Sequence, residues 1–347
     1  MAFRPWVPKR VLATPAALGW AAGAAMVERA AGLGAEVVRL AADRLSGLPD
    51  AYRDAKTTMA VVVASPSRRR LQAIPPSADW RFDLAEGCPA HCQYCYLAGS
   101  LAGPPIIRAY ANLPEILGEL PGAVGLGRVT SGSVARGGEG TTFECSCYTD
   151  PLAIEHLTGS LAASIAYFGE WDAPVQLRFT TKFDAVEPLL GLAHRGRTRV
   201  RFSVNARGAE RLEGGAPRMG ARLAALRRVA MAGYPVGLTV APILRLADWE
   251  GEYERLFREV AEALDGVAAD LTCELITHRF TPKSKGVLAG WYPGSPLEMD
   301  ETTRVRKTTK FGSVKFVFPR EEMVGMRRAL EGALGRWLPG ARVLYWT

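Results

Sequence analysis

Three cysteines within eight residues are the first feature of the sequence that could bind a metal or take part in a reaction. The stretch CPAHCQYCYL contains them: Cys88, Cys92 and Cys95. A structural zinc site needs four ligands, and His91 does not complete a familiar zinc pattern. Three thiolates can instead hold a [4Fe-4S] cluster and leave one iron open to a substrate or cofactor. We therefore predict a cluster on this loop, with a zinc site or three unrelated buried thiols as alternatives.

The composition indicates the setting in which this chemistry would occur. The chain has 347 residues, 48% of them apolar, and six cysteines that cluster rather than spread. Such clustering favours metal or redox chemistry in a reducing compartment over a disulfide framework, which predicts a cytoplasmic protein. The sequence contains no run of about 18 strongly apolar residues, so we expect no membrane span. The stretch KRVLATPAALGWAAGAAMV is expected to be a helix of the folded domain, not a signal peptide.

The elements that must position the cysteines follow a repeated strand and helix pattern. Six short apolar runs predict strands: WRFDLAE, TTFECSC, VQLRFTT, TRVRFSV, PVGLTVA and DLTCELI. Helix-like stretches separate them, so the pattern predicts an α/β chain with a partial (β/α)6 TIM-type barrel; a doubly wound open sheet is the alternative. We expect a small N-terminal α/β region over residues 1–78, the barrel over 79–300, and a C-terminal region with a basic β-hairpin over 301–347.

Polar residues follow the predicted strands at the end where barrel chemistry is found. In parallel barrels the active site lies at the carboxyl ends of the strands. The residues at those ends are Cys147, Thr149, Asp150, Lys182, Ser203, Asn205, His278 and Arg279. One long glycine-rich loop, residues 125–140, is expected to be a mobile insertion, because its single Gly-x-Gly is too weak a signal for phosphate binding.

The net charge of +8 is partly concentrated in one C-terminal stretch. Residues 304–320, RVRKTTKFGSVKFVFPR, contain six basic residues and no acidic one, with phenylalanines between them. The stretch is either a solvated surface hairpin or a strip that follows phosphates and offers rings to bases.

The cluster loop, with an aromatic residue just before its last cysteine, resembles the cluster loop of the radical S-adenosylmethionine (SAM) superfamily. Seven further stretches narrow the resemblance: FECSCYTDPLAIEHLT, LRFTTKF, TRVRFSVNAR, GYPVGLTVAPI, ELITHRFTPKSK, YPGSPLEMDE and the N-terminal FRPWVPKRV. Together with the basic hairpin they resemble the spore photoproduct lyase family, in the same order and over essentially the whole chain.

The resemblance implies a DNA repair lyase that reverses the spore photoproduct, 5-thyminyl-5,6-dihydrothymine, to two thymines. In that family a 5′-deoxyadenosyl radical removes a hydrogen from the lesion, and a cysteine returns one to the product radical. Cys147 matches this donor, and Tyr94 and Tyr96 match tyrosines that pass a hydrogen back so that SAM is regenerated. Lys182 and Ser203 match residues that hold the SAM carboxylate, and we place Asn205 and Tyr96 beside the cofactor.

The resemblance also implies partners. Ultraviolet-damaged DNA is the expected substrate, an electron donor such as flavodoxin or ferredoxin reduces the cluster, and the chain acts as a monomer without a membrane. We expect lesion or phosphate contacts from one set of residues: Thr149, His278, Arg279, Arg304, Arg306, Lys307, Lys310 and Lys315. The hairpin would turn around Gly312 and Ser313, with Phe311 as a wedge into the opened duplex.

The sequence departs from the family near the donor. The family reads Ala-Ala-Cys-Thr-Ser-Asp where this chain has Cys145-Ser146-Cys147-Tyr148-Thr149-Asp150. On a strand, Cys145 would face the same side as Cys147, about 7 Å away, as a core thiol or a second hydrogen donor. Cys273 is expected in the core. Two alternatives to the lyase stay open: a related radical SAM enzyme acting on a different nucleobase lesion or modified nucleotide, and a non-catalytic nucleic-acid-binding protein with a structural metal.

Overall fold

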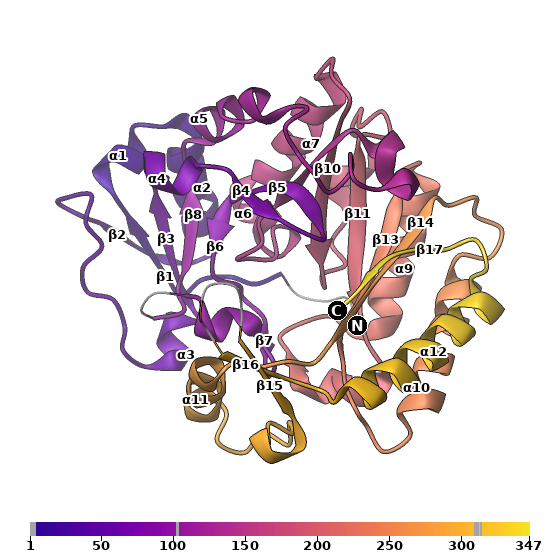
Figure 1. The fold of residues 1–347 in the computed structure, drawn as a ribbon. Helices are drawn as coiled ribbons and strands as arrows, with labels where there is room; N and C mark the ends of the chain where they lie inside the picture. Colours follow the sequence, from indigo (N-terminus) through magenta and orange to yellow (C-terminus); the bar gives the residue numbers. More distant parts are fainter. Residues whose placement is uncertain (1–4, 102–103, 309–311, 313) are drawn as a thin grey trace. The chain divides into compact units, whose positions relative to one another are not determined.

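The computed structural model of the chain describes residues 5–101, 104–308, 312 and 314–347 (Figure 1). These residues form two compact units. The first comprises Met1–Pro89 and Leu101–Val200, and the second comprises Ala90–Ser100 and Arg201–Thr347. The cluster loop after Pro89 thus belongs to the unit built mostly from the C-terminal half of the chain. Strand β11 (Thr198–Val204) begins in the first unit and ends in the second.

The first unit opens with a small sheet of five strands in the order β2-β1-β3-β8-β6. Their bounds are β1 Arg10–Ala13, β2 Glu36–Arg39, β3 Thr58–Val62, β6 Ala85–Glu86 and β8 Ile107–Tyr110. The first three and β8 are parallel, while β6 runs antiparallel to β8. Helix α2 (Ala21–Gly32) packs on this sheet because its apolar face carries Met26 and Val27, which join the buried core around Val11 and Met59.

The same unit contains the first strands of the predicted barrel. Strands β5 (Ala78–Phe82), β9 (Thr141–Cys145) and β10 (Val175–Thr181) are parallel neighbours, and β4 (Gln72–Ile74) adds an antiparallel edge to β5. All of β9 is buried, as expected for a parallel strand covered on both faces. The helices between these strands are α5 Leu113–Gly118, α6 Glu155–Thr158 and α7 Ser160–Glu170, and α8 Glu187–Leu190 follows β10.

The second unit supplies the remaining barrel strands. Strand β13 (Val236–Ile243) pairs in parallel with β14 (Leu271–Thr277), which pairs in parallel with β17 (Arg342–Trp346) near the end of the chain. The helices of this unit are α9 Met219–Met231, α10 Trp249–Ala263, α11 Pro282–Trp291 and α12 Arg320–Trp337. All six predicted barrel strands are therefore present, as β5, β9, β10, β11, β13 and β14. The sequence did not predict β17.

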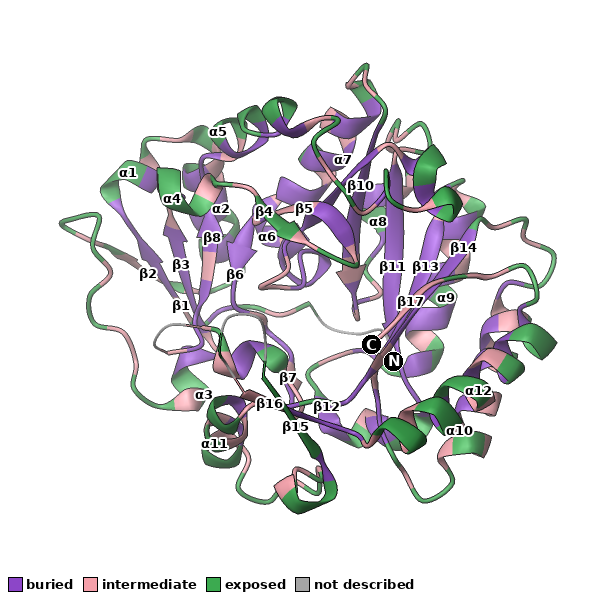
Figure 2. Cartoon of the chain, in the orientation of Figure 1, coloured by how far each residue is buried: buried purple, intermediate pink, exposed green. Residues whose placement is uncertain are grey.

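The predicted basic hairpin is also present. Strand β15 (Val305–Thr308) pairs antiparallel with β16 (Val314–Val317), and every residue of β15 is exposed (Figure 2). The base of the hairpin is anchored by Phe316, whose ring stacks on Phe280 with 5.4 Å between centroids. Lys310, Phe311 and Ser313 lie outside the described residues.

The glycine-rich loop 125–140 is held firmly, which contradicts the expected mobile insertion. The Asp79 carboxylate accepts hydrogen bonds from the backbone N–H of Val129 at 2.7 Å and from the Thr130 hydroxyl at 2.7 Å. Arg136 is buried, pairs with Glu139 and donates to two backbone carbonyls. These contacts satisfy polar groups of the loop and fix it to the neighbouring strand.

The remaining short helices and turns connect these elements: α1 Pro15–Leu18, α3 Tyr52–Ala55, α4 Pro66–Arg69, η1 Tyr96–Gly99, η2 Pro121–Ala123, η3 Val134–Glu139, η4 Leu152–Ile154, η5 Arg207–Leu212 and η6 Glu301–Thr303. Among the described residues, no helix combines the length and the apolar character that a bilayer-spanning segment requires. The division into regions 1–78, 79–300 and 301–347 stays a prediction.

Candidate functional site

The predicted hydrogen donor Cys147 lies on a tight turn directly after β9. The strand ends at Cys145, and Ser146 takes a left-handed conformation with φ of 61°, which is uncommon for a residue other than glycine. Two hydrogen bonds fix it: Ser146 N–H donates to the Phe82 carbonyl at 2.8 Å, and the Ser146 hydroxyl accepts from Leu84 N–H at 3.0 Å. This turn ends the strand alternation, so the expectation that Cys145 and Cys147 share one strand face was wrong.

Cys145 has the surroundings of a core thiol. Its side chain is 1% exposed, and burial raises the pKa of the thiol far above its ordinary value. Its Sγ lies 3.5 Å from the Ser146 hydroxyl. Cys273, in the middle of β14, is fully buried and its thiol pKa is raised in the same way. Cys147 is only partly buried, so the two neighbouring thiols differ in accessibility.

A carboxylate that the sequence reasoning missed, Asp83, lies beside the donor turn. The backbone N–H groups of Tyr148 and Cys147 are close enough to favour its charged form. Burial raises the pKa of Asp83 to about 6, and the positive charge of Arg81 opposes that rise. The Arg81 guanidinium lies 4.4 Å from the centre of the Tyr148 ring. Arg81, Asp83 and the donor turn therefore form one charged cluster around Cys147.

A second carboxylate ties the donor turn to the predicted SAM contact Lys182. Asp150 is buried and accepts from the Thr181 hydroxyl at 2.8 Å and from Lys182 N–H at 2.7 Å. Burial raises the pKa of Asp150 to about 6, and the Lys182 N–H opposes this by stabilising the charged form. The structure thus places the ends of β9 and β10, with Cys147 and Lys182, in one hydrogen-bonded arrangement.

Thr149, the predicted substrate contact, presents an unused hydroxyl. Its Oγ1 is buried and has no hydrogen-bond partner among the described residues. A buried hydroxyl without a partner is destabilising, so such a group is a natural contact for a bound molecule.

The cluster loop is held within the second unit by a short antiparallel ladder. Strand β7 (His91–Cys92) pairs with β12 (Glu213–Gly214), with Cys92 opposite Glu213. Next to it, Gln93 N–H donates to the Leu212 carbonyl at 2.8 Å, and Cys95 N–H donates to the Cys92 carbonyl at 3.2 Å. Cys88 belongs to the first unit, where its carbonyl accepts a hydrogen bond from the Lys56 ammonium.

The donor set on this loop has the chemistry of an iron–sulfur ligand set. None of the six cysteines, all of which are described, forms a disulfide. Within the described ranges, no three His, Cys, Asp or Glu side chains are grouped closely enough to hold a metal ion. The fit therefore rests on the type of donor, three thiols on a short stretch without a carboxylate, and on the fixed backbone of Cys92 and Cys95.

The two predicted relay tyrosines have different surroundings. Tyr96 is 66% exposed. Tyr94 is partly buried, and its phenol donates a hydrogen bond to the Glu213 carboxylate. The contact to a charged group fixes the position of the Tyr94 phenol.

The two predicted cofactor contacts at the carboxyl end of β11, Ser203 and Asn205, are both buried. The Ser203 carbonyl accepts a hydrogen bond from Arg222 at 3.2 Å. The Asn205 amide donates to the Pro242 carbonyl at 2.8 Å and accepts from the Tyr253 hydroxyl at 2.8 Å. These bonds make Asn205 a link between the carboxyl end of β11 and its neighbours in the second unit.

His278 lines a cavity of the second unit with a volume of about 1070 Å³. Its side chain is buried, and Nδ1 has no hydrogen-bond partner among the described residues. Burial, together with the positive charge of Arg304, lowers the pKa of His278 to about 4, so the ring is neutral at pH 7. A neutral imidazole with an unused nitrogen can donate or accept one hydrogen bond to a ligand in this cavity.

The whole chain matches one family model, whose description is spore photoproduct lyase, over residues 6–347. A spore photoproduct lyase of Geobacillus sp. (strain Y412MC61) is 38% identical over 99% of this chain and 100% of its own length. The chain belongs to the spore photoproduct lyase family. The spore photoproduct lyase of Bacillus subtilis (strain 168) is 36% identical over 99% of both chains.

Solved structures of the family confirm the fold class. A spore photoproduct lyase variant with bound AdoMet and dinucleoside spore photoproduct has a TM-score of 0.90, with 37% identity over 99% of this chain and 100% of that chain. Another structure of the enzyme, complexed with dinucleoside spore photoproduct, has the same TM-score of 0.90. The predicted mixed α/β fold with a partial TIM-type barrel is therefore correct.

Not every cation of the basic stretch is available to DNA in this family member. Arg304 is buried, pairs with Glu298 and lies 3.6 Å above the Phe318 ring, so its expected phosphate contact is wrong. The rings of Phe316 and Phe318 are also buried and cannot stack on bases. Arg306 and Lys307 are exposed, and Lys315 stands directly opposite Lys307 in the hairpin ladder.

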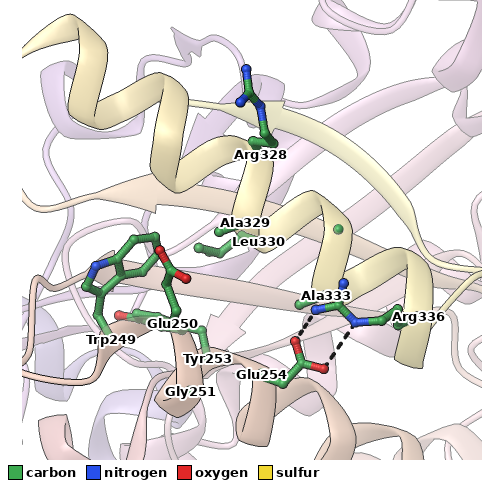
Figure 3. A pocket seen from close by; sticks show the side chains of 11 residues that line it. Trp249, Glu250, Gly251, Tyr253, Glu254, Arg328, Ala329, Leu330, Ala333 and Arg336 are labelled. Atoms are coloured by element: carbon green, nitrogen blue, oxygen red, sulfur yellow. Dashed lines mark hydrogen bonds and ion pairs between the residues drawn. The ribbon is translucent and has the colours of Figure 1, made fainter.

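A separate pocket between α10 and α12 contains none of the predicted lyase site residues (Figure 3). Its volume is about 300 Å³, and the Glu254 carboxylate on one wall pairs with Arg336 on the other. This ion pair connects the two helices, and the lining of the pocket includes neither Cys147 nor His278.

Proposed function

We propose that this chain is a radical SAM DNA repair lyase that reverses the spore photoproduct to two thymines. One observation carries the proposal: full-length similarity, at 37% identity, to an enzyme solved with AdoMet and the dinucleoside lesion. The arrangement of Cys147, Thr149 and Lys182 at the ends of neighbouring strands supports it.

Cys88, Cys92 and Cys95 would hold the [4Fe-4S] cluster, and Lys182 and Ser203 would hold the SAM carboxylate. With SAM bound, the reduced cluster supplies the carbon radical that starts the reaction. The ammonium of Lys182 suits an anion, since it donates hydrogen bonds and carries a positive charge. An electron donor such as flavodoxin or ferredoxin, and a reducing cytoplasmic setting, complete the proposal; the chain acts as a monomer.

Cys147 would return the hydrogen atom that completes repair. Its S–H bond breaks, a C–H bond forms on the methylene carbon of the thymine radical, and the unpaired electron passes to sulfur. Asp83 and Ser146 support this step because they fix the backbone on both sides of the thiol. Tyr94 and Tyr96 would then exchange hydrogen with the sulfur radical.

The lesion would contact Thr149, His278 and Arg279. Thr149 and His278 each carry a buried polar atom without a partner among the described residues, which a bound base could satisfy. Because a dimer inside duplex DNA cannot reach these groups, both bases must leave the stack, at a cost of a few kcal/mol. Arg306, Lys310 and Lys315 would hold the opened duplex through its phosphates.

The decisive experiment is anaerobic turnover of a defined dinucleoside spore photoproduct with SAM and dithionite. Formation of two thymines, measured by chromatography, is the expected result. A reconstituted protein that cleaves SAM but leaves this lesion intact would refute the proposed substrate and favour another nucleobase lesion. A protein that never cleaves SAM would refute radical chemistry as a whole.

The cluster ligands have a matched control within the chain. Replacing Cys88, Cys92 or Cys95 by alanine is expected to abolish both the brown colour and SAM cleavage. Cys273→Ala removes a fully buried thiol from β14 and is expected to keep both. Iron and sulfide analysis of the four variants separates ligand loss from general misfolding.

A further inference from the structure

Glu213 occupies the point where the cluster loop joins the second unit. It forms one half of the two-residue strand β12, opposite Cys92, and its side chain is almost fully buried. Its backbone therefore helps to fix the position of a predicted cluster ligand. The resemblance to the family did not single out this residue.

The Glu213 side chain connects two parts of the site. Its carboxylate accepts the hydrogen bond of the Tyr94 phenol and forms an ion pair with Arg222. Arg222 is also almost fully buried, and it donates to the Pro217 carbonyl at 2.8 Å and to the Ser203 carbonyl at 3.2 Å. A continuous chain of contacts thus runs from the cluster loop to the end of β11.

The ion pair gives this chain of contacts its strength. Burial raises the pKa of Glu213, and the adjacent guanidinium of Arg222 opposes that rise. A hydrogen bond to a charged group is stronger than one between neutral groups. An apolar core at the same place would hold the loop by packing alone and would remove the Glu213 acceptor from the Tyr94 phenol.

We propose that Glu213, held by Arg222, is a positioning residue that fixes the Tyr94 ring and the backbone of Cys92 for catalysis. The proposal rests on the proposed role of Tyr94 in hydrogen transfer. Glu213 acts on the reaction only through these two neighbours and takes no part in bond making itself. Loss of Glu213 therefore changes how much SAM is consumed per lesion repaired, and it loosens the cluster loop.

The test replaces the buried pair without leaving a lone charge. Breaking one partner of a buried ion pair strongly destabilises a protein, whereas exchanging both for apolar residues is often neutral. The test variant is Glu213→Leu/Arg222→Met. The matched control is Glu274→Leu/Arg201→Met, because Arg201 and Glu274 form another almost fully buried pair of the same unit, 2.7 Å apart.

The first readout does not depend on activity. Hydrogen exchange of the full-length, metal-free protein is followed in the peptide covering residues 88–97 and compared with a peptide from α12. Loss of a charge-assisted hydrogen bond is expected to speed exchange of the loop about tenfold or more in the test variant. The control pair should leave the ratio between the two peptides unchanged. Equal loop exchange in the test variant and the parent would overturn the proposal.

The second readout is the amount of 5′-deoxyadenosine released per lesion repaired by the reconstituted enzyme. If Glu213 acts through Tyr94, Tyr94→Phe raises this ratio in the parent but adds nothing in the test variant. Additive effects would mean that Glu213 and Tyr94 act independently, and the positioning role would be wrong. A parent that repairs no lesion would refute the proposed function, yet the exchange result would still decide whether Glu213 holds the loop.

Discussion

The charged face of the hairpin allows a prediction about DNA binding whose size follows from the structure. Lys307 and Lys315 are cross-strand partners, and the pKa of Lys315 is lowered by burial and then by the positive charges of Arg279 and Lys307. None of these three cations has a carboxylate partner within the described residues. A lysine with two other cations beside it is stabilised by an anion, and a DNA phosphate is the anion that this enzyme meets.

We expect Lys307→Ala/Lys315→Ala to weaken binding of lesion-bearing duplex and to flatten its salt dependence. Each phosphate contact adds about 0.9 to the slope of log affinity against log salt, so two contacts add about 1.8. Between about 50 and 200 mM salt, the parent should therefore lose roughly 12-fold more affinity than the double variant. Turnover of the free dinucleoside lesion should stay close to that of the parent, because it has no flanking phosphates to hold.

Fluorescence anisotropy with a labelled duplex at four salt concentrations measures the slope. The control variant Arg44→Ala/Arg53→Ala removes the same charge from exposed positions of the first unit. An unchanged slope in the hairpin variant would show that the hairpin is only a solvated surface. An equal change in the control would assign the effect to net charge, and collapse of dinucleoside turnover would make the hairpin part of the fold.

Three further predictions concern the first unit. Cys147→Ala should still cleave SAM and consume the lesion but release trapped adducts in place of thymine, and an unchanged thymine yield would move the donor role to another residue. Thr149→Val, which removes the buried hydroxyl, should raise KM for the dinucleoside about 3- to 10-fold, the value of one hydrogen bond, whereas Thr149→Ser should stay near the parent. Burial raises the pKa of Glu155 from 4.5 to about 7, so between these pH values the folded protein keeps a proton on Glu155 that the unfolded chain has lost. The free energy of unfolding therefore falls by up to about 3 kcal/mol as the pH rises from about 4.5 to 7. Urea unfolding of Glu155→Gln at pH 5 and 7.5 should show a smaller difference than the parent.

The barrel strands were predictable because a buried parallel strand leaves a continuous apolar run in the sequence. Strand β17 was missed because RVLYW comes after the repeated strand and helix pattern has ended. It pairs with β14, a strand far away in the sequence. The N-terminal sheet extends to β8 at Ile107–Tyr110, which no local pattern could assign to residues some 50 positions earlier. Periodicity reports which face of an element is buried, but not which distant strand covers its edge.

Sequence motifs predicted the cluster cysteines, the hydrogen donor and Lys182. They did not predict the residues that hold these side chains in place. Asp83 and Glu213 act through contacts with backbone N–H groups and with the Tyr94 phenol, and such contacts leave no periodic trace in the sequence. The burial of several arginines is the feature that sequence reasoning predicts least well. Arg178, Arg199, Arg201 and Arg222 are each at most 1% exposed, although a sequence reader assigns such residues to the surface. Only the folded contacts, such as the pair of Arg201 with Glu274, explain why these charges are inside.

The ladder between β7 and β12 also allows a prediction of when the protein can receive the proposed cluster. Tyr94 and its anchor Glu213 are separated by 119 residues. At roughly 5–20 residues per second, the ribosome needs about 6–24 s to make that stretch. During this interval the emerging chain carries its cysteines without the strand that orders them. Iron and sulfide delivery is therefore expected to follow synthesis of residue 214, and a ribosome-bound chain truncated before β12 should not assemble the cluster.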